Sequence, residues 1–188
     1  MASRTLEGEA VSVSRAHLIL VTGGARSGKS RFALELAEGQ PFRKRLFVAT
    51  GVACDSEMKA RIARHRKSRD GRWATLEEPI QLPERLPKRL LTPGSLILLD
   101  CLATFVTNLL LAKISTPQIH RKMDTLLTTC RRPGVTAVFV SNEVGSGLVP
   151  EYPLGRRFRD ILGAVNQKVA QAADEVYFLV AGVPLRLK

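Results

Sequence analysis

One segment of the chain combines the residue types and the spacing that suit the binding of a phosphate. Residues 23–30 read GGARSGKS and fit the pattern G-x-x-x-x-G-K-S/T. Glycines let successive backbone N–H groups close around a phosphate, while a lysine reaches the outer phosphates of a triphosphate and a hydroxyl binds Mg²⁺. Here Lys29 and Ser30 supply the last two groups. The predicted phosphate-binding residues are Gly23, Gly24, Ala25, Arg26, Ser27, Gly28, Lys29 and Ser30.

Polar side chains that follow two apolar runs are further candidates for this site. Asp100 closes the run LILLD and is the candidate partner of Ser30 in binding Mg²⁺. Its alternative role is to cap the helix that follows. Asn142 and Glu143 follow a second run, where they either face the same crevice or only form a turn before two glycines. The residue types alone leave both alternatives open.

A histidine on a predicted arginine-rich helix is the candidate nucleophile. Within residues 55–69, Met58, Ile62 and His65 are four and then three residues apart, so they share one helix face. Such a stripe by itself favours an ordinary packed histidine. The alternative is that His65 attacks a phosphorus atom, because neighbouring arginines would neutralise the phosphate oxygens and keep the imidazole neutral.

Strand and helix signals alternate along the chain. Continuous apolar runs predict strands at residues 17–21, 45–50, 96–100, 135–141 and 175–180. Helical spacing predicts helices at residues 31–39, 55–69, from about 104 through the 120s with an interruption near Pro117, and 156–173. Residues 76–94 hold four prolines and are predicted to be an irregular connector. We therefore expect an α/β fold with a mostly parallel open sheet, helices on both faces, and ligands at the carboxyl ends of the strands.

The length and the cysteine pattern predict one domain in the cytoplasm. Residues 17–188 are expected to form a single α/β domain, and residues 1–16 a flexible N-terminal extension. Three widely spaced cysteines favour a reducing compartment and argue against a structural zinc site. The most apolar stretch, residues 95–112, holds Asp100 near its centre, so we expect a strand running into a helix and no membrane insertion.

Positive charge is concentrated around the predicted phosphate site. The chain carries 29 Lys and Arg against 17 Asp and Glu, and residues 26–72 alone hold 13 bases against 5 acids. An anionic partner is therefore expected. Only 5% of the residues are aromatic and the sequence shows no nucleic-acid-binding module, so a small polyphosphate is favoured over nucleic acid.

Several segments together resemble one enzyme family. They are LILVTGGARSGKSR, VATGVACDSEMKARIARHRKSRDGRW, ILLDCLATFVTNLL and the run that begins with VSNEVGSGLVP. From about residue 17 to residue 188, the chain resembles the bifunctional adenosylcobinamide kinase / adenosylcobinamide-phosphate guanylyltransferase family of cobalamin biosynthesis. The joint presence of GGARSGKSR, E-M-x-x-R-I-x-x-H and S-N-E-V-G-x-G-x-V-P is far more specific than a phosphate loop alone.

The resemblance implies a P-loop NTPase-like fold with one antiparallel edge strand, assembled into a homotrimer. It also implies two reactions that use Mg²⁺, with GTP and ATP as substrates. In the first, ATP or GTP phosphorylates adenosylcobinamide. In the second, GTP guanylylates a histidine, and the GMP then passes to adenosylcobinamide phosphate, which gives adenosylcobinamide-GDP and pyrophosphate. No nucleic acid or membrane partner is implied.

The resemblance assigns residues as well. The family's nucleophile falls on His65, and Lys29 is placed to absorb the growing charge on the pyrophosphate. Besides residues 23–30, the nucleotide contacts fall on Thr50, Gly51, Val52, Lys67, Ser68, Arg69, Asp70, Glu77 and Asp100. Two other functions would leave His65 as a packed residue: a simple P-loop kinase for a small molecule without a covalent intermediate, and an NTPase module that binds nucleic acid.

Overall fold

The computed structural model describes residues 15–39, 42–52 and 71–188. The strands are β1 (His17–Gly23), β2 (Lys44–Ala49), β3 (Trp73–Glu77), β4 (Ser95–Asp100), β5 (Val135–Val140), β6 (Glu175–Val180) and β7 (Val183–Arg186). The helices are α1 (Lys29–Glu38), α3 (Leu102–Leu111), α4 (Thr116–Cys130) and α5 (Pro153–Ala172), and a 3₁₀ helix covers Lys88–Leu90. The helix predicted over residues 55–69 and most of the predicted N-terminal extension lie outside the described residues.

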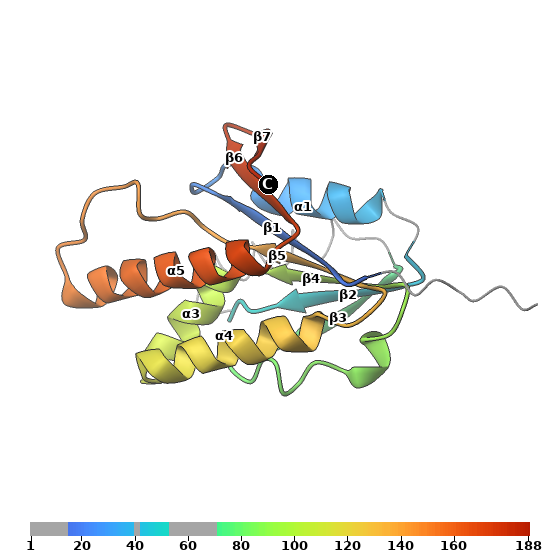
Figure 1. Ribbon diagram of the computed structural model, residues 1–188. Coiled ribbons are helices and arrows are strands. Elements are labelled where there is room, and N and C mark those ends of the chain that lie inside the picture. Colours follow the sequence, from blue (N-terminus) through green and yellow to red (C-terminus); the bar gives the residue numbers. More distant parts are fainter. Residues whose placement is uncertain (1–14, 40–41, 53–70) are drawn as a thin grey trace, which may run out of the picture.

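Across the described ranges, seven strands form one sheet in the order β3-β2-β4-β5-β1-β6-β7. All neighbouring strands are parallel except β6 and β7, which are antiparallel. Helix α1 covers one face of the sheet, and α3, α4 and α5 cover the other (Figure 1). The predicted α/β class and mostly parallel sheet are confirmed, and β7 is the antiparallel edge strand that the resemblance implied.

The side chains of each central strand alternate between two cores, which explains the continuous apolar runs. On β1, Leu18 and Leu20 join the core beneath α3, α4 and α5. Ile19 and Val21 point the other way and join the core beneath α1. Both sets are buried because helices cover both faces of the sheet, so no polar face breaks the run.

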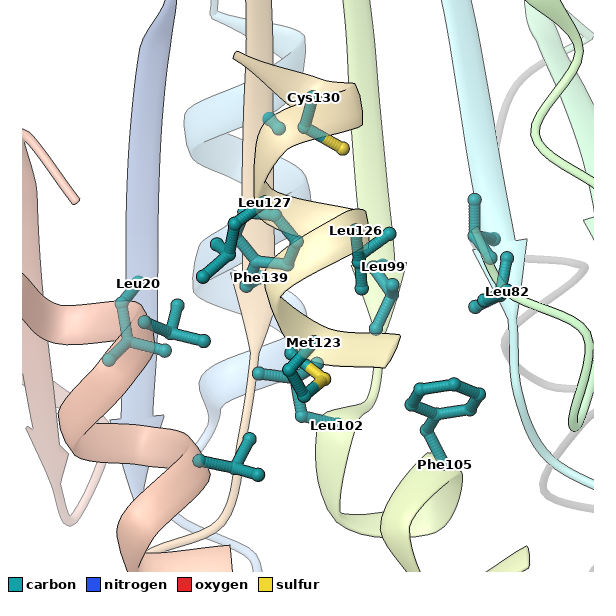
Figure 2. Packing of buried hydrophobic residues seen from close by; sticks show 14 of the residues in the cluster. Leu20, Leu82, Leu99, Leu102, Phe105, Met123, Leu126, Leu127, Cys130 and Phe139 are labelled. Carbon is teal, nitrogen blue, oxygen red and sulfur yellow. The ribbon is translucent and has the colours of Figure 1, made fainter. Parts of the chain in front are cut away.

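The larger core lies between the sheet and three helices. Figure 2 shows that α4 contributes Met123, Leu126 and Leu127 to it, opposite Leu99 and Phe139 of the sheet. The connector predicted over residues 76–94 is irregular apart from its 3₁₀ turn and its first two residues, which end β3. It also adds three buried leucines, at positions 82, 86 and 91. This apolar layer holds the helices firmly against the strands whose carboxyl ends are considered below.

Some helix boundaries differ from the prediction for local reasons. The predicted interruption near Pro117 is a complete break, because α3 ends at Leu111 and α4 starts anew at Thr116. Ser115 caps α4 in a capping box with Gln118, and Pro117 lies in the first turn, where a proline costs no hydrogen bond. Helix α5 likewise begins earlier than predicted, at Pro153.

The apolar pattern does not predict the two edge strands. Only Trp73 is buried among the side chains of β3, and no side chain of β7 is buried. An edge strand with little burial carries no long apolar run, so its pairing depends on backbone hydrogen bonds to the neighbouring strand. In β7 the run is also interrupted by Pro184, which cannot donate a backbone hydrogen bond.

Residues 95–112 form β4 followed by α3, as the sequence predicts. Asp100 is the last residue of β4 and separates the apolar strand from the apolar helix. Among the helices described, none combines the length and the apolar character needed to cross a membrane.

Replacing Phe105 with alanine tests the core beneath α3. Its side chain is 0% exposed, so Phe105→Ala should lower the free energy of unfolding by about 3–5 kcal/mol. On the same helix Leu111 is 65% exposed, and Leu111→Ala should change this free energy by at most about 0.5 kcal/mol. Urea denaturation followed by circular dichroism measures both. Equal losses in the two variants would contradict this description of the core.

Candidate active site

The carboxyl ends of five parallel strands meet at one edge of the sheet. The register aligns Val21, Val140, Asp100, Ala49 and Glu77 in one row across β1, β5, β4, β2 and β3. The segments that follow these strands therefore leave the sheet side by side, at the edge where open α/β sheets bind ligands. The structure brings together at this edge all the predicted site residues that it describes, namely 23–30, 50–52, 77 and 100.

One strand separates the phosphate loop from the candidate magnesium ligand. Strand β5 lies between β1 and β4, so Asp100 is two strands away from the strand that leads into residues 24–28. Neighbouring strands are about 4.8 Å apart, which places the two strand ends about 10 Å apart. That spacing leaves room for a phosphate and a cation between them.

The phosphate loop lies between β1 and α1, the context that its motif requires. Strand β1 ends at Gly23, and Gly28 is the N-cap residue of α1 with a left-handed φ of 92°. The amide of Phe32 donates to the Gly28 carbonyl at 3.0 Å and so starts the helix directly after the loop. The helix N-terminus adds partial positive charge and unpaired N–H groups at this point.

Glycine is required at Gly23 and Gly28 but not at Gly24. A Cβ added at Gly23, where φ is 150°, would lie 2.5 Å from the Leu179 carbonyl oxygen of β6. A Cβ added at Gly24 would have no atom within 4 Å. Arg26 is exposed and takes a left-handed φ of 56°, so the loop turns sharply there without a glycine. The path of the loop therefore requires glycine at position 23, where the main chain passes close to the backbone of β6.

Lys29 directs its ammonium group toward the backbone of the loop. The side chain is buried, and Nζ donates to the Gly24 carbonyl and, at 3.4 Å, to the Ser27 hydroxyl. A buried ammonium beside the helix N-terminus concentrates positive charge inside the loop. Ser30 is half-buried in the first turn of α1, and Ala25 is exposed at the tip of the loop. This is an arrangement that can bind and polarise a phosphate group.

Two segments far along the chain support the loop. The Glu143 amide donates to the Gly23 carbonyl at 2.9 Å, and the Gly182 amide donates to the Ser27 carbonyl at 3.0 Å. Gly182 belongs to the two-residue turn between β6 and β7, where Ala181 and Gly182 both have positive φ. The sequence analysis did not identify this support. Its signal is Ala-Gly between two apolar runs, a pair that suits a tight hairpin turn.

Thr50 is a buried junction at the end of β2. Its hydroxyl donates to the Cys101 carbonyl at 2.8 Å and accepts from the Cys101 amide at 3.0 Å. Its carbonyl accepts from Asn108 Nδ2 at 2.8 Å. Because the Thr50 hydroxyl and carbonyl are both engaged within the protein, the side chain holds the ends of β2 and β4 together. Gly51 is half-buried and Val52 exposed just beyond this junction.

Asn108 is a site-supporting residue that the sequence analysis did not identify. It lies in the middle of α3 within the run FVTNLLLA, where every close neighbour but Thr107 is apolar. Asparagine is a poor helix former, so a single asparagine in an apolar helix is a signal of a tertiary role.

Asp100 does not cap the helix that follows it. The N-cap residue of α3 is Cys101, and Asp100 is half-buried at the end of β4. Burial, and then the negative charge of Asp100, raises the pKa of the Cys101 thiol, so this cysteine stays protonated and unreactive at neutral pH. Glu77 is exposed at the end of β3.

Among the described residues, the carboxylates at this edge do not form a cluster that could bind a metal ion by itself. Within the described ranges, no group of three or more His, Cys, Asp or Glu side chains is arranged to hold a metal ion. A cation held by the described residues alone would need further ligands, such as the phosphates of a bound substrate. Mg²⁺ suits such a site, since it is commonly held by one or two protein groups together with substrate phosphates and water.

Glu143 forms a turn and also contacts the phosphate loop through its backbone. Its carboxylate accepts a hydrogen bond from the Gly145 amide two residues on, which is the turn-forming role. Asn142 offers its carbonyl to Asn166 Nδ2 of α5 at 2.9 Å. The segment after β5 is thus fixed to α5 on one side and to Gly23 on the other.

The predicted nucleophile cannot be placed. His65, together with Lys67, Ser68, Arg69 and Asp70, lies outside the described residues, so the roles assigned to them stay predictions. The last described residue before this range is Val52 and the first after it is Gly71, which precedes β3.

Substituting the loop glycines tests the required backbone approach. Gly23→Ala should lower the free energy of unfolding by about 1–3 kcal/mol, because the new methyl group meets the Leu179 carbonyl in a backbone conformation that alanine avoids. Gly24→Ala, the matched control, should change it by at most about 0.5 kcal/mol. Urea denaturation measures both variants, and a larger loss for Gly24→Ala would contradict this description of the loop.

Curated relatives match the chain over nearly its whole length. The bifunctional adenosylcobalamin biosynthesis protein CobU of Salmonella typhimurium is 43% identical over 183 residues, which cover 91% of this chain and 99% of the relative. The protein of the same name from Escherichia coli is 40% identical over the same shares of the two chains.

Solved structures with low sequence identity share the fold. A KaiC-like protein of Pyrococcus horikoshii aligns with a TM-score of 0.50 at 16% identity, covering 87% of this chain and 71% of that one. An ATPase from a type III secretion system of pathogenic bacteria aligns with a TM-score of 0.56 at 11% identity, covering 88% of this chain and 51% of that one. These likenesses concern the fold alone, which is P-loop NTPase-like.

One family model matches almost the whole described domain. The model of cobinamide kinase / cobinamide phosphate guanyltransferase covers residues 19–187, which include the phosphate loop, the ends of β2 and β4, and the segment that contains His65. Together with the two curated relatives, this match shows that the chain belongs to the cobinamide kinase / cobinamide phosphate guanyltransferase family.

Proposed function

We propose that this chain carries out both reactions of its family at the carboxyl edge of the sheet. The first is phosphorylation of adenosylcobinamide by ATP or GTP, and the second is transfer of GMP from GTP to adenosylcobinamide phosphate through a guanylylated His65. The observation that carries the proposal is the phosphate loop, formed between β1 and α1 with Lys29 inside it. The curated relatives support the pair of activities, because their names call them bifunctional.

In the phosphoryl transfer, the loop binds the triphosphate and stabilises the charge that develops on it. A hydroxyl oxygen of adenosylcobinamide attacks the γ-phosphorus, and the bond from this phosphorus to the β-phosphate oxygen breaks. The nucleoside diphosphate leaves, and the hydroxyl proton passes to solvent water. Backbone N–H groups of the loop and the Lys29 ammonium would bind the phosphate oxygens as their negative charge increases. His65 has no role in this step.

Mg²⁺ fits the residues at this edge. Ser30 in the first turn of α1 and Asp100 at the end of β4 would hold it, with the phosphates between them. When bound, the ion supplies Lewis-acid stabilisation of the phosphate oxygens.

In the guanylyl transfer, a neutral His65 nitrogen attacks the α-phosphorus of GTP. The bond to the β-phosphate oxygen breaks and pyrophosphate leaves, with its charge bound by Lys29 and the loop amides. A phosphate oxygen of adenosylcobinamide phosphate then attacks the same phosphorus and displaces the His65 nitrogen. The products are adenosylcobinamide-GDP and the original imidazole.

The remaining contacts belong to the same proposal. In the guanylyl transfer, GTP is bound by Gly51, Val52, Lys67, Ser68, Arg69, Asp70 and Glu77 as well as by the phosphate loop. Thr50 is 0% exposed, so it supports this site by holding the main chain before Gly51 and does not contact the nucleotide itself. The protein acts in the cytoplasm as a homotrimer and forms no complex with nucleic acid or membrane. The support for these statements is the family resemblance. The GTP contacts are also supported by the register of β2 and β3, which pairs Glu77 with Ala49, two residues before Gly51.

Labelling with GTP that carries a radioactive α-phosphate tests the covalent step. The wild-type protein with Mg²⁺ should retain label that is labile in acid and stable in alkali, as a phosphoramidate is. His65→Ala should retain none, because the attacking nitrogen is gone. His120→Ala is the matched control: His120 lies half-buried on α4 and is not among the residues assigned to the site, so its loss should leave the labelling unchanged.

The His65→Ala variant also distinguishes the proposed function from that of a simple kinase. His65→Ala should still transfer the γ-phosphate to adenosylcobinamide, because that step uses the loop and Lys29. Absence of label on the wild-type protein, with phosphorylation intact, would leave only the simple kinase. Labelling of His65→Ala at the wild-type level would show that another residue is the nucleophile.

A further inference from the structure

The main chain that leads into the His65 segment is fixed at Thr50. The Thr50 amide donates to the Asp100 carbonyl at 3.4 Å, and its hydroxyl makes two hydrogen bonds with the Cys101 backbone. The side chain is 0% exposed. Three residues later the chain enters the range 53–70, which contains His65. Thr50 is therefore a fixed point of the described main chain close before this range.

A single side chain from α3 joins Thr50 to the segment that follows β3. Asn108 Nδ2 donates to the Thr50 carbonyl at 2.8 Å and to the Pro79 carbonyl at 3.2 Å. Both partners are acceptors, so only the amide nitrogen can face them and the orientation of the amide is unambiguous. The two N–H groups of Asn108 thus set the separation of the two main-chain segments.

The segment after β3 is rigid at the point that Asn108 contacts. The buried carboxylate of Glu78 accepts from the amides of Ile80, at 3.1 Å, and Gln81, at 2.7 Å, which closes a turn around Pro79. The Glu78 amide also donates to the Ala49 carbonyl at 3.0 Å. Asn108 therefore ties Thr50 to a fixed point, and not to a loose loop.

The phosphate loop is held by different contacts. Its supports are the Glu143 amide on Gly23 and the Gly182 amide on Ser27, neither of which involves α3. Loss of the Asn108 hydrogen bonds would thus remove the donor of the Thr50 carbonyl and the link between Thr50 and Pro79, while the loop that binds the triphosphate keeps its supports.

We propose that Asn108 is a positioning residue for guanylyl transfer, which acts by holding the Thr50 main chain and so the start of the His65 segment. This inference rests on the proposed function. It makes the two reactions respond differently to one substitution: guanylylation of His65 needs the tether, and phosphoryl transfer does not. A residue that served only for stability would affect both reactions alike.

The experiment compares the two reactions in Asn108→Leu and Asn108→Asp. The rate of His65 guanylylation is measured in a single turnover with α-labelled GTP, and phosphoryl transfer is measured with adenosylcobinamide on the same preparation. Guanylylation should fall about tenfold or more relative to phosphoryl transfer, because two carbonyl groups lose their donors. The ratio of the two rates does not depend on the folded fraction of the sample.

Thr107→Val is the matched control on the same helix. The Thr107 hydroxyl donates to the Ala103 carbonyl of its own helix at 3.0 Å and, within the described part of the chain, hydrogen-bonds to neither segment. Its replacement should leave the ratio of the two rates at the wild-type value.

A pH profile of Asn108→Asp adds a readout that a cavity or a general loss of stability would not produce. Ionised, the introduced carboxyl cannot donate and faces two carbonyl oxygens, so its pKa should lie above the ordinary value. Protonated, it can donate one hydrogen bond. Its guanylylation rate relative to that of the wild type should therefore rise as the pH falls, and Asn108→Leu should show no such rise.

The outcomes separate this inference from the proposed function. A wild-type protein that forms no adduct refutes the proposed function, and the inference falls with it. A wild-type protein that forms the adduct, with Asn108 variants that lower both rates equally or neither, refutes the inference alone. A selective loss of guanylylation, with partial recovery of Asn108→Asp at low pH, supports it.

Discussion

The site depends on a backbone contact that only glycine permits. Gly23 lies so close to Leu179 that any side chain would collide with the carbonyl of β6. The turn that follows is held by main-chain hydrogen bonds from Glu143 to Gly23 and from Gly182 to Ser27. Because these bonds come from the segment after β5 and from the β6–β7 hairpin, the loop is supported from both neighbouring strands of the sheet. The Lys29 ammonium is thus presented by a frame that does not have to reorganise when charge develops on a phosphate.

At two places along this edge, an asparagine side chain from a helix holds the main chain that follows a strand. On the β1 side, Asn166 of α5 donates to the Asn142 carbonyl at 2.9 Å, and on the β2 side, Asn108 of α3 donates to the Thr50 carbonyl at 2.8 Å. Each amide satisfies a carbonyl that lies just beyond a strand, where the sheet no longer supplies a partner. Both helices pack on the same face of the sheet, so one apolar core positions both halves.

The chemistry-bearing residues were predictable where a short pattern carries the information. The phosphate loop follows from eight consecutive residues, and Asp100 follows from its place after an apolar strand. Asn108 and Gly182 act on residues far away in the chain, so no local pattern shows what they contact. The edge strands β3 and β7 were not predicted for another reason. A strand with little burial has no apolar periodicity that the sequence could show. For His65, spacing favours a packed residue, and only the wider family motif indicates a nucleophile.

The central claim is that one imidazole accepts GMP from a triphosphate bound in this loop. Peptide mass mapping under alkaline conditions, after reaction of the full chain with GTP and Mg²⁺, tests it most directly. The account predicts one modified peptide, which contains His65 and carries GMP. A modification found on any other residue, or a protein that binds GTP with no modified peptide, would contradict it.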